Sequence, residues 1–176
     1  RDGQANLYPG SPAIGQVFLR ENDRAQLFEL HPSDFVRLDE LMSADRRVRV
    51  YNSDGFAGLI ASVPPLERRG LVLMDPPYEI KTDYETVVST IEKAYRRFAT
   101  GTYALWYPVV DRARIKKLEQ ALKNSGIKRI QLFELGLSAD TEGRGMTSSG
   151  MIVINPPWTL KSTLDTLLPK LADHLG

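Results

Sequence analysis

The segment Asp75-Pro76-Pro77-Tyr78 is the part of the sequence best suited to chemistry, and it directly follows the apolar run 71–74. The two prolines fix two successive backbone dihedrals and remove two N–H donors, so the turn is rigid and its carbonyl groups can accept hydrogen bonds. A carboxylate beside a proline carbonyl can accept both hydrogens of an exocyclic amine, while an aromatic ring stacks on the heterocycle. The pattern predicts that Asp75, Pro76 and Tyr78 hold a planar heterocyclic amine and free its nitrogen lone pair to attack an electrophilic methyl group.

The plainer interpretation of this motif is a stiff exit from a strand, with Asp75 capping the turn. We favour the functional interpretation because an acid precedes the prolines, an aromatic residue follows them and a buried strand lies upstream. A second motif, Asn-Pro-Pro-Trp at 155–158, follows the apolar run 151–154. An asparagine carbonyl can also accept an amine hydrogen, but this motif closes the last strand of the chain. We therefore expect it to be mainly a structural exit.

Two further acids, Glu29 and Asp54, also follow expected strands. In an open parallel sheet, ligands bind at the carboxyl ends of the strands, where an acid typically accepts hydrogen bonds from ribose hydroxyls. Glu29 fits that role, and it fits a plain surface carboxylate equally well. Asp54 and Gly55 could bind an adenine amine, with the glycine letting the ring approach the backbone. The alternative for Asp54 is an Asx turn that caps the next helix.

Other polar and basic residues could also touch a ligand. Ser11 is predicted to be a helix N-cap with Pro12 at the first helical position, and that N-terminus could bind a ligand carboxylate. Arg144, in the loop 143–150, could reach a substrate phosphate, or the loop could be a plain hairpin. Paired basic residues are expected mainly on the solvated surface, with a subset following a nucleic-acid backbone. These pairs are Arg46-Arg47, Arg68-Arg69, Arg96-Arg97, Lys116-Lys117 and Lys128-Arg129.

The elements that must position these residues alternate between apolar runs and amphipathic stretches. Residues that are apolar in succession indicate strands covered on both faces, and apolar residues at helical spacing indicate helices. The expected strands are 26–30, 48–51, 71–74, 102–107, 130–137 and 151–154, and the expected helices are 33–44, a short segment ending near 63, 83–98, 112–123 and 160–175. This order predicts an α/β fold with a mostly parallel sheet and right-handed crossovers. The last two strands lack an intervening helix, so we expect the final strand to be antiparallel.

Composition excludes several classes of protein. The 176 residues are 42% hydrophobic and 26% charged with a net charge of +1, which suits one folded domain and excludes a disordered chain or a polybasic tail. No apolar run approaches the roughly 18 residues that span a bilayer, so we expect no membrane partner. The lack of cysteine excludes disulfides and thiolate metal sites, and two histidines are too few for a multi-histidine site. We therefore expect no metal.

Taken in order, the motifs resemble those of one bacterial family, the 23S ribosomal RNA adenine N6-methyltransferases, which are also described as involved in the use of external DNA. The matching segments cover essentially the whole chain and are 8–12, 29–32, 54–56, 75–79, 102–108, 144–147 and 150–158. The resemblance implies a class I, Rossmann-like methyltransferase fold. It also implies an enzyme that uses S-adenosylmethionine to methylate the exocyclic amine of an adenine in 23S ribosomal RNA.

The resemblance implies a role for several residues. In that family, the residues that match Ser11, Glu29 and the pair Asp54-Gly55 bind the cofactor, and the aspartate that matches Asp75 is catalytic. DNA adenine methyltransferases share the Asp-Pro-Pro-Tyr motif, so methylation of DNA adenine is an alternative. A non-catalytic nucleic-acid-binding protein linked to the use of external DNA is another.

The family also carries an N-terminal stretch that holds the first sheet strand and a glycine-rich cofactor loop. Nothing before Glu29 in this sequence matches that stretch. We therefore expect residues 1–176 to form a single methyltransferase domain that lacks its N-terminal segment. We further expect a cytoplasmic monomer.

Overall fold

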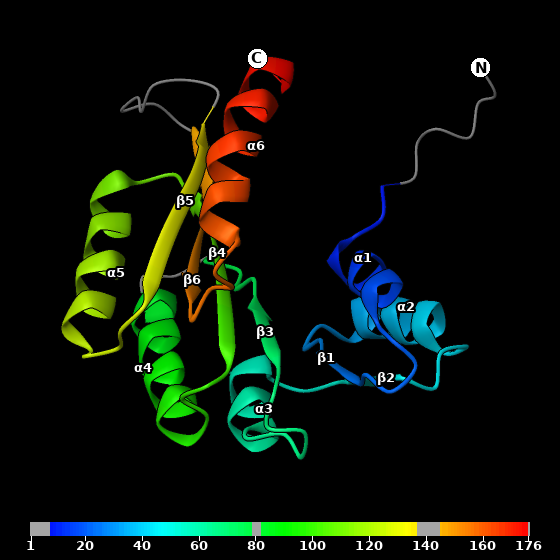
Figure 1. Cartoon of the computed structure of the whole chain (residues 1–176). Coiled ribbons are helices and arrows are strands. Elements are labelled where there is room, and N and C mark those ends of the chain that lie inside the picture. The colour runs from blue at the N-terminus through cyan, green and yellow to red at the C-terminus, as the bar shows by residue number, and fades with distance from the viewer. Residues whose placement is uncertain (1–7, 79–81, 137–144, 176) are drawn as a thin grey trace, which may run out of the picture. The chain divides into compact units, whose positions relative to one another are not determined.

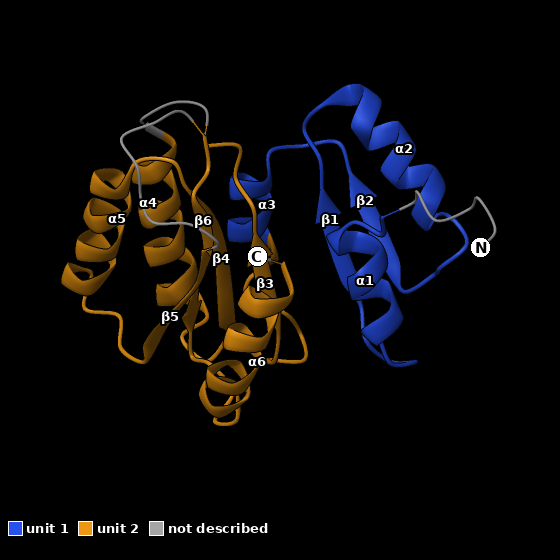
Figure 2. Cartoon of the chain, turned by 90° about the horizontal axis from the view of Figure 1, so that it is seen from above, with its two compact units in different colours: residues 1–61 blue, residues 62–176 orange. Residues whose placement is uncertain are grey.

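Helices and strands alternate along the part of the chain that the structure, a computed structural model, describes: residues 8–78, 82–136 and 145–175 (Figure 1). The chain divides into two compact units, residues 1–61 and 62–176 (Figure 2). That the two units form a single methyltransferase domain stays a prediction.

The first unit is built on a two-stranded parallel sheet. Its elements are α1 (Ser11–Phe18), β1 (Ala25–Phe28), α2 (Pro32–Met42), β2 (Val48–Tyr51) and α3 (Gly55–Ser62), the last of which ends at the boundary of the unit. At the carboxyl ends of the strands, Phe28 lies opposite Tyr51 and their rings stack with centroids 5.2 Å apart. Helix α2 connects the two strands, as a parallel pair requires.

Helix α1 begins one residue earlier than predicted, so the prediction that Ser11 is its N-cap is wrong. Gly10 is the N-cap, Ser11 is the first helical residue and Pro12 is the second. Glycine is acceptable as an N-cap, and a proline in the first turn removes an N–H that has no partner within the helix. After the helix, Arg47 Nη1 donates to the carbonyl oxygen of Leu19 at 2.5 Å, which anchors the end of α1 to the start of β2.

The second unit is a four-stranded sheet with helices on both faces (Figure 2). Its elements are β3 (Leu71–Met74), α4 (Thr82–Arg97), β4 (Thr102–Val109), α5 (Arg112–Asn124), β5 (Ile130–Gly136), β6 (Ser148–Ile154) and α6 (Leu160–Leu175). The strand order is β3-β4-β6-β5, and β6 is antiparallel to both of its neighbours. Strands β3, β4 and β5 therefore share one direction, which confirms a mostly parallel sheet with an antiparallel last strand.

Strand β4 carries the centre of this core. Its side chains alternate, and Tyr103, Leu105, Tyr107 and Val109 are all buried. Helices α4 and α5 cover one face of the sheet with fully buried apolar residues, and α6 lies on the other face (Figure 2). These residues are Val87, Ile91 and Ala94 from α4 and Ile115, Leu118 and Leu122 from α5.

A shared carboxylate fastens the end of β4 to β5 and to α5. The Tyr107 hydroxyl donates to Glu134 Oε1 at 2.8 Å, and Arg112 Nη1 donates to the same oxygen at 2.7 Å. Burial raises the pKa of Tyr107, so its hydroxyl stays protonated and donates at neutral pH. The two charged side chains are 30% and 23% exposed, so water screens this ion pair less than a surface pair. The contact holds the start of α5 at the carboxyl edge of the sheet.

The packing of β6 against β4 leads to a first prediction. A Cβ added to Gly150 would overlap the ring of Tyr107, which is fully buried and held by its hydrogen bond to Glu134. We expect Gly150→Ala to lower the free energy of unfolding by about 1–3 kcal/mol, because the ring has no room to move. Urea denaturation measures this change. Ser149→Ala is the control and should change stability by less than about 1 kcal/mol; equal effects of the two variants would contradict the packing described.

Candidate active site

Asp75 is the first residue after β3, at the edge of the sheet where β3 and β4 both end. It is exposed to solvent, and among the described residues its carboxylate has no hydrogen-bond or ion-pair partner. Partial burial raises the pKa of the Asp75 carboxyl group. No hydrogen bond in the described part of the chain supports the plainer interpretation of Asp75 as a turn cap. The carboxylate remains available as an acceptor.

The second Pro-Pro motif differs from the first, because the side chain of Asn155 makes hydrogen bonds within the fold. Its Nδ2 donates to the carbonyl oxygens of Ala99 and Gly101, each at 2.8 Å. The backbone of Asn155 is left-handed, with φ of 51°, a conformation that asparagine tolerates better than most residues. Asn155 therefore ties the end of β6 to the turn before β4, and the prediction of a structural exit is confirmed.

Tyr78 fastens the Asp75 turn to β4. The Tyr78 hydroxyl donates to the carbonyl oxygen of Trp106 at 2.6 Å, and its ring packs on Tyr84 with centroids 4.8 Å apart. The side chain is only 9% exposed, and this burial is the main reason that the pKa of the Tyr78 hydroxyl is raised. Pro76 is buried as well. Contact of Pro76 and Tyr78 with a substrate base stays a prediction.

In the first unit, the structure brings Glu29 and Asp54 to the same edge of the β1-β2 sheet. Glu29 follows β1, its Oε1 accepts the His31 N–H at 2.8 Å, and Asn52 Nδ2 donates to its carbonyl oxygen at 2.9 Å. Asp54 follows β2 and caps α3, since its two carboxylate oxygens accept the N–H groups of Phe56 and Ala57 at 3.1 and 3.0 Å. The Asx-turn interpretation of Asp54 is therefore confirmed.

The other residues predicted to bind the cofactor make fewer contacts in the structure. Gly55 is the first residue of α3, and a Cβ there would make only an ordinary 3.6 Å contact with Phe28. Ser11 is exposed, and no hydrogen bond joins it to Glu29 or Asp54 in the described part of the chain. Arg144 lies outside the described residues. Cofactor binding by Ser11, Glu29, Asp54 and Gly55 stays a prediction.

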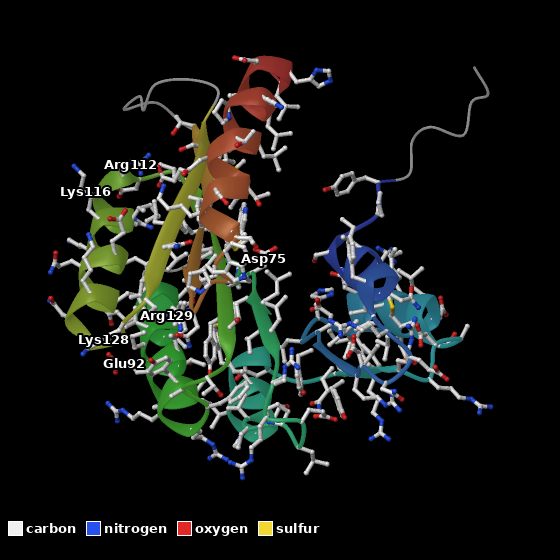
Figure 3. All side chains as sticks on the ribbon, viewed as in Figure 1. Asp75, Glu92, Arg112, Lys116, Lys128 and Arg129 are labelled. Atoms are coloured by element: carbon white, nitrogen blue, oxygen red, sulfur yellow. The ribbon has the colours of Figure 1, made fainter. Side chains whose placement is uncertain are left out.

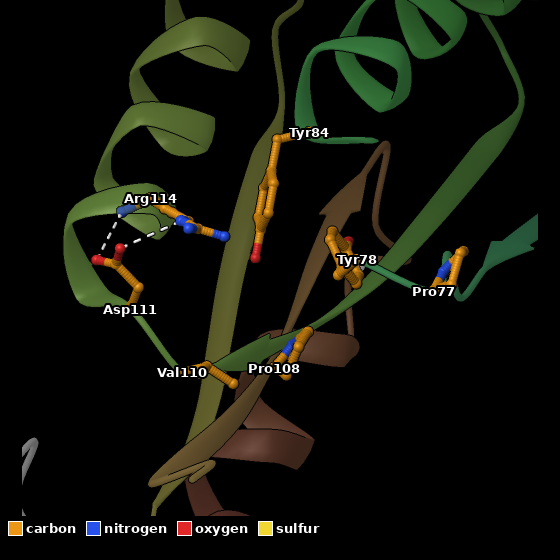
Figure 4. A pocket seen from close by; sticks show the side chains of 7 residues that line it. All are labelled: Pro77, Tyr78, Tyr84, Pro108, Val110, Asp111 and Arg114. Carbon is orange, nitrogen blue, oxygen red and sulfur yellow. Dashed lines mark hydrogen bonds and ion pairs between the residues drawn. The ribbon is translucent and has the colours of Figure 1, made fainter. Parts of the chain in front are cut away.

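Three residues that surround Tyr78 in the structure were not predicted from the sequence. Tyr84, Asp111 and Arg114 line a cavity together with Tyr78 (Figure 4). Asp111 is the N-cap of α5, where its Oδ1 accepts the N–H groups of Ala113 and Arg114 at 2.9 and 3.3 Å. An acid between a strand and a helix is a recognisable N-cap signal, so it could have pointed to Asp111.

Among residues 8–78, 82–136 and 145–175, no group of three His, Asp or Glu residues could hold a metal ion. No helix in the same ranges is both long enough and apolar enough to cross a membrane. That no metal takes part stays a prediction.

The strand order of the second unit and the acids that follow the parallel strands define a class I S-adenosylmethionine-dependent methyltransferase fold. A solved structure described as the delta-N METTL16 MTase domain is similar, with a TM-score of 0.53 over 82% of this chain and 67% of that chain. At 12% identity this likeness shows the fold alone. It confirms the predicted fold class.

The chain belongs to the family described as Ribosomal RNA large subunit methyltransferase D, RlmJ, whose model matches residues 1–176. It is 54% identical over 175 residues to Ribosomal RNA large subunit methyltransferase J of Escherichia coli (strain K12), covering 99% of this chain and 62% of that protein. The crystal structure of protein LPL1258 from Legionella pneumophila is 38% identical, with a TM-score of 0.86 over 93% of this chain and 61% of that one. The chain thus spans about three fifths of the length of the curated relatives it matches. The family resemblance is confirmed.

The contrast between the two Pro-Pro motifs gives a second prediction. We expect Asn155→Ala to destabilise the protein by about 1–3 kcal/mol, because two carbonyl groups lose their donor and alanine disfavours a positive φ. Asp75→Ala removes no hydrogen bond within the described structure and removes a partly desolvated charge, so its free energy of unfolding should not fall below that of the parent. Urea denaturation of both variants measures the difference. A loss of stability in Asp75→Ala as large as that in Asn155→Ala would mean that both side chains are structural.

Proposed function

We propose that the protein transfers a methyl group from S-adenosylmethionine to the N6 amine of an adenine in 23S ribosomal RNA. The observation that carries this proposal is Asp75, whose carboxylate has no partner among the described residues and lies in a rigid Pro-Pro turn at the carboxyl end of a parallel strand. Ligands bind at this edge of an open α/β sheet. A relative named as a large subunit ribosomal RNA methyltransferase, 54% identical to this chain, supports the choice of substrate.

Asp75 has two tasks in this reaction. Its carboxylate accepts one hydrogen of the adenine amine and the carbonyl oxygen of Pro76 accepts the other, which draws the nitrogen lone pair out of conjugation with the ring. When bound, S-adenosylmethionine supplies a methyl group already activated on a sulfonium, so no metal is needed. As the N–C bond forms and the S–C bond breaks, the carboxylate takes the proton that the nitrogen loses and passes it to water. Tyr78 is proposed to contact the extruded base.

The acids of the first unit suit the cofactor. One oxygen of the Glu29 carboxylate accepts a backbone N–H, so the other can accept ribose hydroxyls. Each oxygen of Asp54 accepts one N–H and keeps a lone pair for an adenine amine, which Gly55 leaves room to approach. The exposed hydroxyl of Ser11, at the N-terminus of α1, would meet the cofactor carboxylate.

The biological setting follows from the substrate. The proposed partner is 23S ribosomal RNA, and reaching its amine requires a base that is unpaired or extruded, at a cost of a few kcal/mol. We place the protein in the cytoplasm, as a monomer.

The third prediction tests the role of Asp75 in the full-length protein. Asp75→Ala should lower methyl transfer from labelled S-adenosylmethionine to unmodified 23S ribosomal RNA by about 10²-fold or more, because the amine loses its acceptor. Binding of the cofactor should not change. Glu67→Ala, which removes an exposed acid from the same unit, is the control and should keep the parent rate. Equal rates in Asp75→Ala and the parent would refute the assignment, and a preference for DNA as methyl acceptor would refute the choice of RNA.

The fourth prediction concerns pH. Because burial raises the pKa of Asp75 above 3.8, its carboxylate becomes protonated at a higher pH than that of an ordinary aspartate. As the pH is lowered, methyl transfer should therefore begin to fall at that higher pH. The raised pKa means that the folded protein binds this proton more tightly than the unfolded chain, so ionisation lowers stability as pH rises through that window. Asp75→Asn should therefore be at least as stable as the parent at pH 7, with the difference vanishing on acidification. A rate–pH profile and urea denaturation at two pH values check both effects; an Asp75→Asn variant that is less stable at pH 7 would contradict the desolvated carboxylate.

A further inference from the structure

A cavity of about 260 Å³ lies where β3 and β4 end (Figure 4). Pro77 and Tyr78 from the turn after β3 form one wall, and Pro108 and Val110 from the end of β4 form another. The first turns of α4 and α5 complete the lining with Tyr84, Asp111 and Arg114. Drug-sized ligands occupy pockets of about 300–1,000 Å³, so a cavity of this size suits a single planar ring system.

The lining combines the two kinds of surface that a nucleotide needs. Tyr84, Pro108 and Val110 offer aromatic and apolar faces, and Val110 is 56% exposed although it is apolar. Burial raises the pKa of Tyr84, so its hydroxyl is a neutral donor at physiological pH. A base packed on such surfaces gains stacking energy whatever its identity.

Arg114 supplies the positive charge of the cavity. Its Nε lies 3.2 Å from Asp111 Oδ2, and in Figure 4 the guanidinium group points from this pair toward Tyr84. The pair leaves both Nη groups without a partner among the described residues. The side chain is 47% exposed, so a phosphate group can reach it. A guanidinium held in place by a carboxylate is well suited to bind a phosphate.

Basic residues gather at the start of α5, where Arg112 pairs with Glu134 and Arg114 pairs with Asp111. Arg112, Arg114, Lys116 and Lys117 all lie in its first two turns. Cations near a helix N-terminus are opposed by the helix dipole, so this arrangement costs the helix free energy. Among the described residues no ion-pair partner of either lysine is found. Figure 3 shows Arg112 and Lys116 together at this end of α5.

The basic residues at the opposite edge of the sheet are different. Arg96 and Arg97 end α4, where the dipole favours cations, and Arg97 Nε also donates to the carbonyl oxygen of Val63 at 3.0 Å. Lys128 and Arg129 precede β5 and lie at the other end of α5 from Arg112 and Lys116 (Figure 3). The basic residues at the start of α5 adjoin the cavity through Arg114, which is part of its lining.

We propose that this cavity holds the nucleotide next to the methylated adenine, with its base against Tyr84 and its phosphate on Arg114. Lys116 and Lys117 lie further along α5 and follow the backbone away from the cavity. This inference rests on the proposed function, since it assumes an RNA substrate whose target base meets the Asp75 turn. The cavity would add a second point of contact with the substrate, which would favour a polynucleotide over a free nucleoside.

The test measures binding of the full-length protein to an unmodified single-stranded 23S ribosomal RNA fragment at several salt concentrations. Arg114→Gln should weaken binding and reduce the slope of log Kd against log salt by about 0.7, the value for one phosphate contact in a single strand. Tyr84→Ala should weaken binding by about 5- to 150-fold, and Tyr84→Phe should bind like the parent because the ring remains. Lys128→Gln removes one charge at the other edge and should leave the slope unchanged.

The possible results distinguish the proposed nucleotide site from the proposed methyltransferase function. If the parent protein methylates the RNA but Arg114→Gln and Tyr84→Ala bind like Lys128→Gln, the cavity is not a nucleotide site and the proposed function stands. Weaker binding by Arg114→Gln with an unchanged salt slope would mean a structural role and also overturn the inference. A parent protein that binds no RNA would overturn both. Should Tyr84→Ala fail to fold, the exposed Arg114 carries the test alone.

Discussion

The parallel pairing of β3 with β4 is the constraint on which the candidate active site depends. Met74 lies opposite Leu105, so the two strands end side by side and their following turns meet at one edge. The Tyr78 hydroxyl closes this arrangement by donating to the carbonyl oxygen of Trp106. The bond joins the turn that carries Asp75 to β4, whose alternate side chains are buried in the core. A carboxylate held by a turn that is fastened in this way is pre-organised for the proposed role of Asp75.

Two similar motifs serve different purposes because their polar side chains meet different surroundings. Asn155 finds the open carbonyl groups of Ala99 and Gly101 and becomes part of the scaffold. Asp75 finds no such partner within the described part of the chain, and partial burial disfavours its charge. An unsatisfied, partly desolvated acid costs stability, and such costs are commonly retained where a group binds a ligand. The Asn155 turn is therefore structural, whereas the Asp75 turn is a candidate catalytic one.

Predictions from local sequence were correct where the residues that contact each other lie close together in the sequence. Asp54 precedes α3, and its carboxylate reaches two N–H groups within three residues, so an Asx turn was predictable. The start of α1 was misplaced by one residue because Gly10 and Ser11 are both acceptable N-caps, and local preference does not separate them. The cavity beside Tyr78 was missed because its lining comes from two stretches of the chain that lie far apart in the sequence, within 77–84 and 108–114. No pattern of spacing along the chain connects Tyr84 with Arg114.

The sequence by itself determined the alternation of strands and helices, the positions of the acids that follow the strands and the family to which the chain belongs. These follow from hydrophobic periodicity and short motifs, which act over a few residues. Only the tertiary structure decided that β6 lies between β4 and β5, that Tyr78 is fastened to Trp106 and that the Asn155 side chain is already used. It also placed Arg114 at the cavity beside Tyr78, while Arg96 and Arg97 end α4, where the helix dipole favours cations. Such decisions depend on strand pairing and burial between distant segments, which no local pattern encodes.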